Sequence, residues 1–430
     1  MIEGIITDIK SLAQERPLIT SEILRTNDLY GHAYILKRYA GLKDSYQIKG
    51  VLEHAAMLFD HVWPNDLAAP FPAHFVFSSH RFPFLRQLTN KALFAIGPSI
   101  HYAQPIFSDQ EIKEIKRAMG KTLLVFLPHS AKSLLVQYDK KEILSYLKSI
   151  EKDFDNILVC VGWRDVLLDC EKPFISEGYT CVTAGHINDR NFLPRLKTLI
   201  LISTHTMSFG FGTHVGFCVH LNRPHWIVHL KTTLEGPEGI QKTSTYKGTP
   251  LGYGYSEHFL KFFKEPLDDI TKEQQKAVDF LWGISDIKSS EELMEIFHVT
   301  EDMFLGRYYP SNKRDPIFFC QIFDYLIQGN TKKAEFLLNY AKKIDFHPGW
   351  ISFFRELIKG QDRKSEEVDK IVQGLERYGV FFRDSANLLW QNKHKGDSLK
   401  KIKENLYKMY PRPQFYQHRK MELPWKREVI

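Results

Sequence analysis

The chain has no apolar run that approaches the ~20 residues needed to span a bilayer. Its first residues, MIEGIITDIK, include acidic side chains and no continuous apolar core, so we do not expect a secretory signal. The five cysteines are odd in number and include no CxxC pair, which favours a reducing compartment. These absences predict a cytoplasmic protein.

Signatures of metal and nucleic-acid binding are also missing. The histidines are scattered, and no HExxH or paired-carboxylate motif occurs. Asp153-Phe154-Asp155 has the spelling of a DxD metal motif, but it precedes its strand, so we interpret it as coincidence. No zinc-finger, RNA-recognition or helix-turn-helix pattern is present. We expect no metal, no cofactor and no nucleic-acid partner.

The net charge of +7 has much of its excess near the C-terminus. There KHKGDSLKKIKENLYK and YQHRKMELPWKR mix Lys and Arg with aromatic residues. A solvated helix face is the simpler interpretation. The alternative is contact with anionic lipid headgroups or an anionic glycan, which would place the protein peripherally at the inner face of the cell membrane.

Short β-rich runs alternate with helical patterns from residue 73 to residue 229, as in an α/β protein with parallel sheets. Ser108, with Glu111 three residues later, predicts a capped helix over residues 108–120. We interpret that helix as the connection between two Rossmann-like halves. The expected domains are a Rossmann-like domain with leading helices over 1–110, a second Rossmann-like domain over 111–270 and a helical region over 271–430.

Residues 179–228 contain the most specific pattern. A strand at 179–182 precedes a helix at 191–200, a second strand at 199–203 and a glycine-containing turn before a helix at 215–221. Gly210 and Gly212 let backbone approach a ligand closely, and the following helix offers its free N–H groups to an anion. Ser208 and Thr213 can add hydroxyl donors. The alternative is a tight turn in which the glycines serve geometry alone.

This segment resembles the C-terminal half of GT-B glycosyltransferases that build bacterial surface polysaccharides such as capsule, O-antigen or lipopolysaccharide. The resemblance lies in Ser203-Thr204, residues 210–213 and residues 221–224. The resemblance extends loosely over residues 44–228. It implies that the helix start holds the phosphate of a nucleotide-sugar donor without a metal. The helix at 215–221 lacks the acidic residue of the family pattern, which leaves the ribose contact unassigned. A weaker similarity to sialyl- and Kdo-type transferases suggests a CMP-linked acidic sugar.

The resemblance also implies site residues at the ends of predicted strands. The donor-side candidates are His129, Ser130, Gly185, His186, Ser208, Gly210, Gly212, Thr213 and His214, with Lys132 and Arg81 as further phosphate or sugar contacts. Glu53 or His54 is the candidate catalytic base, because a carboxylate or imidazole can deprotonate a sugar hydroxyl. The alternative is a helix that turns through Lys49-Gly50 into residues 51–58, in which Glu53 and His54 would be ordinary surface side chains. Asp60, His61 and Asp66 are alternative bases.

From residue 271 the pattern is almost entirely helical, and residues 316–350 resemble a tetratricopeptide-type hairpin with an incomplete consensus. We therefore expect a glycosyltransferase that moves a sugar from a nucleotide-activated donor to a glycan or lipid-linked glycan acceptor. Two alternatives stay open: a non-catalytic helical-repeat binding protein and a UDP-sugar epimerase-like enzyme.

Overall fold

The computed structural model describes residues 8–18, 22–56, 71–85, 91–131, 135–235, 241–244 and 259–304, together with isolated positions between 62 and 89 and between 331 and 355. Two compact units can be distinguished. The first comprises Met1–Ala69, Ala73–Phe82 and Ala92–Glu301, and all three sheets of the described residues belong to it.

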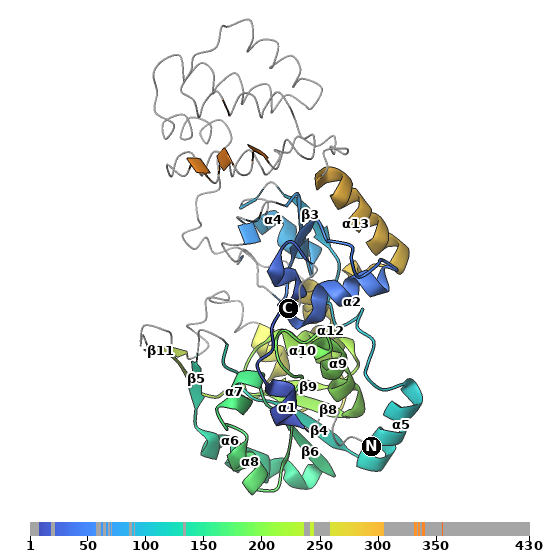
Figure 1. Ribbon diagram of the computed structural model, residues 1–430. Helices are drawn as coiled ribbons and strands as arrows, with labels where there is room; N and C mark the ends of the chain where they lie inside the picture. Colours follow the sequence, from blue (N-terminus) through green and yellow to red (C-terminus); the bar gives the residue numbers. More distant parts are fainter. Residues whose placement is uncertain are drawn as a thin grey trace, which may run out of the picture. The chain divides into compact units, whose positions relative to one another are not determined.

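Within the described residues, the main sheet has five parallel strands in the order β7-β6-β4-β8-β9 (Figure 1). These strands are β4 (Thr122–Phe126), β6 (Asn156–Cys160), β7 (Thr180–Val182), β8 (His205–Ser208) and β9 (His225–Ile227). In the central strand β4, every residue is buried. Continuous apolar sequence is what a parallel strand covered on both faces requires.

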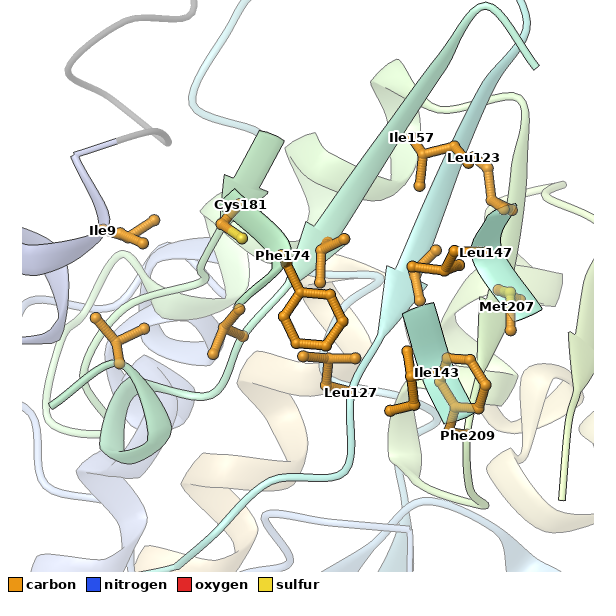
Figure 2. Close-up of a cluster of buried hydrophobic side chains, with 14 of the residues drawn as sticks. Ile9, Leu123, Leu127, Ile143, Leu147, Ile157, Phe174, Cys181, Met207 and Phe209 are labelled. Carbon is orange, nitrogen blue, oxygen red and sulfur yellow. The ribbon is translucent and has the colours of Figure 1, made fainter. Parts of the chain in front are cut away.

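Helices cover both faces of this sheet. On one face, α1 (Ile9–Ala13), α6 (Lys140–Ile150), α7 (Trp163–Leu167) and α8 (Lys172–Ser176) contribute to a hydrophobic cluster with the alternate β4 residues Leu123 and Val125 (Figure 2). α10 (Thr213–His220) lies against the opposite face, where His214 stacks on Phe126 with ring centroids 4.5 Å apart. α9 (Phe192–Ile202) also contacts β4.

A second parallel sheet, in the order β1-β2-β3, forms the N-terminal half. Its strands are β1 (Gly50–Leu52), β2 (Ala73–Val76) and β3 (Ala92–Ala95), accompanied by η1 (Arg25–Gly31), α2 (His32–Tyr39), η2 (Ser79–Arg81) and α4 (Phe82–Leu85). The side chain of Asn27 holds β1 at both ends: it donates to Gly50 O and accepts from Leu52 N, each at 2.9 Å. Buried backbone groups are thereby satisfied where no neighbouring strand reaches them.

A third, antiparallel sheet was not expected from the sequence. β5 (Leu135–Tyr138), β10 (Thr232–Glu235) and β11 (Gln241–Ser244) pair in the order β11-β10-β5. The Gly-, Ser- and Thr-rich composition near residue 241 favoured a loop. Backbone pairing with a distant strand decides such short polar segments, and local composition does not reveal it.

The helices on either side of the main sheet follow their sequence signals. α5 (Asp109–Met119) begins with the predicted Ser108–Glu111 capping box. α12 (Lys272–Trp282) has a second box formed by Thr271 and Gln274. The short elements η3 (Glu151–Asp153), η5 (Lys261–Phe263) and η6 (Ile284–Asp286) and the helix α13 (Ser290–Phe304) complete the continuous described part. The predicted helical hairpins beyond residue 304 lie almost wholly outside the described residues.

Two local predictions were wrong. The segment after Lys49 does not turn directly into a helix, because Gly50–Leu52 is strand β1 paired with β2. The strand predicted at residues 199–203 is instead the last turn of α9, and β8 lies further on at His205–Ser208. Leu199, Ile200 and Ile202 are all fully buried and continue the apolar pattern of the helix, so a run of apolar residues was mistaken for a strand.

The α/β class and the two parallel sheets confirm the predicted fold and are consistent with GT-B architecture. Among the described helices, none combines the length and the hydropathy that crossing a bilayer demands.

Packing between α10 and α12 depends on a glycine. A Cβ added at Gly216 would overlap the ring of Trp282, which is fully buried. We expect Gly216→Ala to lower the free energy of unfolding by about 1–3 kcal/mol, the usual cost of overpacking. Urea unfolding measures this. The double variant Gly216→Ala/Trp282→Leu should lose less unfolding free energy than the two single variants lose together, because the smaller side chain removes the overlap. A Gly216→Ala protein as stable as the wild type would contradict the packing described.

Candidate functional site

The strand order of the main sheet locates a site before any side chain is considered. From β4 the chain moves outward to β6 and β7, and α9 then carries it back across to β8 and β9 on the other side of β4. The loops after β4 and β8 therefore leave the sheet in opposite directions. Open α/β sheets bind ligands at the carboxyl ends of the two strands where the order reverses. Here those two loops carry His129 and Gly210.

The loop after β4 is held by hydrogen bonds to α7 and to β5. Ser130 N donates to the buried Asp165 Oδ2 at 2.9 Å, and Ser130 Oγ accepts from Val136 N at 3.0 Å. Gly162 permits this approach, since a Cβ there would lie 2.7 Å from His129 Cβ. Ser130 is buried, whereas His129 is exposed. The loop thus presents His129 to solvent and uses the Ser130 oxygen internally; Lys132, predicted beside them, lies outside the described residues.

The turn after β8 leads directly into α10. Ser208 Oγ donates to Gly210 O at 2.7 Å, and the ring of His214 packs over Gly212, where a Cβ would lie 2.7 Å from its Cε1 atom. Gly212 caps α10 in an extended conformation without a side-chain hydrogen bond. The first-turn N–H groups and the positive end of the helix dipole face outward from such a start. A phosphate group is a ligand that such a helix start can bind.

In the N-terminal half, Glu53 and His54 follow β1 immediately, at its carboxyl end. Glu53 is buried, forms an ion pair with Arg81 and accepts from Phe77 N at 3.2 Å. Arg81 is itself buried, so this pair belongs to the interior of the N-terminal half. His54 is half-buried and stacks on Tyr30 at 6.2 Å, and its buried Nδ1 has no hydrogen-bond partner among the described residues.

One hydrogen bond joins the two halves at this point. Ala56 N donates to Thr213 Oγ1 at 3.0 Å, so the loop that carries His54 touches the first residue of α10. The loop that follows the candidate base therefore contacts the first residue after the candidate phosphate-binding glycine, 157 residues further along the chain. Trp282 Nε1 donates to Thr213 O at 3.0 Å and holds the same residue from α12.

The histidines around this contact are kept neutral by their surroundings. Burial lowers the pKa of His54 to about 4. Burial, followed by the neighbouring His129, lowers the pKa of His214 to about 3. Burial and then His54 lower the pKa of His32 to about 3. A neutral imidazole can accept a proton at neutral pH, which an imidazolium cannot do.

Gly185 and His186 lie at the end of β7, an edge strand of the main sheet, and their contacts differ from those of the group around Thr213. Gly185 has φ +97°, and a Cβ there would lie 2.6 Å from Arg195 Nη1. His186 is buried, packs edge-on against Trp163 at 4.2 Å and donates its backbone N–H to Leu12 O at 3.0 Å. The described contacts of His186 are thus with α1, α7 and neighbouring loops. Of the alternative bases, Asp66 is buried, while Asp60 and His61 lie outside the described residues.

Several residues of this region were missed from the sequence. Tyr30, with φ 57°, is held by a hydrogen bond from its N–H to Ile187 O at 2.7 Å. Gly31 follows with φ +80°, and a Cβ there would overlap Arg190 O. Strained backbone conformations of this kind cluster at functional sites, and Tyr30 stacks on the candidate base His54. The Tyr30-Gly31 pair was the sequence feature that could have indicated this turn. No sequence feature indicated the roles of Asp165 and His225.

No family model matches the chain, and no curated protein matches it. Among solved structures, the chain is similar to a variant of the wall teichoic acid polymerase TagF, with a TM-score of 0.35 and 14% sequence identity over 61% of this chain and 70% of that one. A likeness at this level carries no argument about activity.

Buried neutral histidines make stability depend on pH. The unfolded chain titrates its histidines near pH 6.5, whereas His32 and His225 are protonated only well below that value when folded. The unfolded state therefore binds more protons below about pH 6.5. The free energy of unfolding should decrease as the pH is lowered, by up to about 1.4 kcal/mol per pH unit for each such histidine.

Urea unfolding at several pH values measures this slope. His32→Gln should reduce it, because one buried imidazole is removed, and His80→Gln, at an exposed position, serves as the control. A free energy of unfolding that stays constant from about pH 7.5 to about pH 5.5 would show that these rings are not desolvated.

Proposed function

We propose that the protein is a glycosyltransferase of GT-B type that moves a sugar from a nucleotide-activated donor to a glycan acceptor. The observation that carries the proposal is the hydrogen bond from Ala56 N to Thr213 Oγ1 at 3.0 Å. It joins the loop that carries His54, a neutral imidazole, to the start of α10 at the strand-order reversal of the other half. Transfer needs both: a group that accepts the proton of the attacking hydroxyl and a group that stabilises the departing phosphate.

The donor phosphate belongs at the turn of residues 210–213 in this proposal. Gly210 and Gly212 admit close approach of the phosphate to backbone N–H groups, and the dipole of α10 favours the negative charge that develops as the sugar–phosphate bond breaks. His129 reaches the same strand-end region from the loop after β4. The donor is bound as a substrate, and no cofactor or metal takes part in the proposal.

We assign the base to His54. The Glu53 carboxylate is already engaged by Arg81 and by Phe77 N, so accepting a proton would break a buried ion pair. His54 is half-buried and uncharged at neutral pH, and its Nδ1 has no partner among the described residues. Glu53 and Arg81 position the loop, and His54 acts on the acceptor hydroxyl.

The identities of donor and acceptor are finer parts of the proposal. A CMP-linked acidic sugar and a cell-surface or lipid-linked glycan acceptor rest on the sequence resemblance, as does peripheral membrane contact through the basic C-terminus. The epimerase-like and helical-repeat alternatives gain no specific observation from the described residues.

Thermal unfolding against CMP, UDP, GDP and TDP tests the donor site. A ligand that binds only the folded state raises Tm by mass action, so one nucleotide should raise it and thereby name the base. Thr213→Ala should weaken the shift, because Ala56 N loses its acceptor and the turn loses its tether. Thr213→Ser keeps the hydroxyl and is the matched control. Absence of a shift with every nucleotide would remove the support for a donor site.

His54→Gln separates catalysis from donor binding. It should leave the nucleotide-induced rise in Tm intact, yet slow donor cleavage by about 10²–10⁴-fold, the range for loss of a general base. The rate is measured as hydrolysis of the nucleotide sugar selected above. In the wild type the rate should hold down to about pH 5 and fall as pH approaches 4, because His54 is neutral above its lowered pKa of about 4. A full rate in His54→Gln would move the base elsewhere.

A further inference from the structure

His225, the first residue of β9, lies in a network of hydroxyl groups that the proposed mechanism does not use. It is 2% exposed. Its Nδ1 lies 2.9 Å from Thr206 Oγ1, and its Nε2 lies 3.1 Å from Ser208 Oγ. Both partners are on the neighbouring strand β8, and Ser208 leads into the turn of residues 210–213.

We take the neutral tautomer that has its hydrogen on Nε2. In this tautomer Ser208 Oγ donates to Gly210 O at 2.7 Å and accepts from His225 Nε2 at 3.1 Å. The unprotonated Nδ1 then accepts from the hydroxyl of Thr206. Every polar group of the ring is satisfied in this state.

The same network can also accommodate a proton on Nδ1 of His225. Thr206 Oγ1 also lies 3.0 Å from Pro224 O, so its hydroxyl hydrogen can turn from the ring to that carbonyl. Once Nδ1 is protonated, it donates to Thr206 Oγ1 and Thr206 donates to Pro224 O. Protonation of His225 therefore sacrifices no hydrogen bond of the ring, and only the burial of charge opposes it.

The neighbours of His225 supply no counter-charge. From α10 come His214, with ring centroids 5.7 Å apart, and the Cys218 thiol, which contacts Thr206. β4 contributes Phe126, η5 contributes Phe263, and α12 contributes Gln274, whose amide reaches His225 O at 3.5 Å. No carboxylate is recorded among the described contacts of the ring, so burial, and then His214, hold its pKa well below the ordinary value.

We propose that binding of an anionic phosphate at the turn of residues 210–213 is coupled to uptake of a proton at Nδ1 of His225. The incoming charge provides the counter-ion that the protein lacks, and the ring is connected to the turn through Ser208 and Gly210. His225 is a positioning residue: its Nε2–H keeps Ser208 an acceptor, so that the Ser208 hydroxyl stays bonded to Gly210 O. The inference rests on the donor site proposed above.

Calorimetry in two buffers of different ionisation enthalpy counts the protons taken up. UDP-glucose and CMP-sialic acid are suitable probes, because their phosphate diesters do not titrate near pH 6.5. We expect up to one proton to be taken up per bound ligand, and affinity to rise as pH falls, by at most about tenfold per pH unit. His225→Asn should abolish both effects, and His220→Gln, at a histidine on the C-terminal end of α10, should leave them unchanged.

The outcomes separate the two proposals. Ligand binding without proton uptake would overturn the coupling and leave the donor site intact. Uptake that persists in His225→Asn but is lost in His214→Gln would assign the proton to His214 and overturn the role of His225. If neither sugar nucleotide binds, the donor site fails, and ¹⁵N-histidine spectra with inorganic pyrophosphate then decide the coupling alone. A second N–H on His225 supports it, and a ring that keeps only its Nε2–H overturns it.

Discussion

The Thr213 hydroxyl holds together the parts on which the candidate site depends. It accepts Ala56 N from the N-terminal half, while the carbonyl of the same residue accepts Trp282 Nε1 from α12. Thr213 is also the first residue of α10, whose packing on α12 requires Gly216. The position of the candidate phosphate-binding turn is thus determined by three segments that are distant in sequence, and a change in any of them would alter the turn.

Desolvation is the second constraint: it keeps the imidazoles neutral at neutral pH, and it also lowers their strength as bases. His32, His54, His214 and His225 all have lowered pKa values, chiefly because protein surrounds them. Neutral rings can accept protons and do not repel one another. Neutral imidazoles add no fixed positive charge, so among these groups an anion at the turn is met by backbone N–H groups, a helix dipole and any proton it brings in.

The structure shows contacts of the predicted site residues that the sequence did not reveal. Glu53 and His54 were expected at the interdomain face, and the structure divides them: Glu53 turns inward to Arg81, while His54 stacks on Tyr30 near α10. Ser208 was expected to face a donor, and it is bonded to Gly210 O and His225 instead. Adjacent residues after a strand point in different directions, and which one is paired depends on partners far along the chain.

The α/β class, the capped helix α5 and the glycine turn before α10 could be predicted from the sequence, because apolar periodicity, capping boxes and glycine act locally. The antiparallel β5-β10-β11 sheet, the position of β8, the hydroxyl network around His225 and the contact of Ala56 with Thr213 became visible only in the folded chain. Those features rest on hydrogen bonds between residues far apart in the chain, and no local pattern encodes the partner of such a bond.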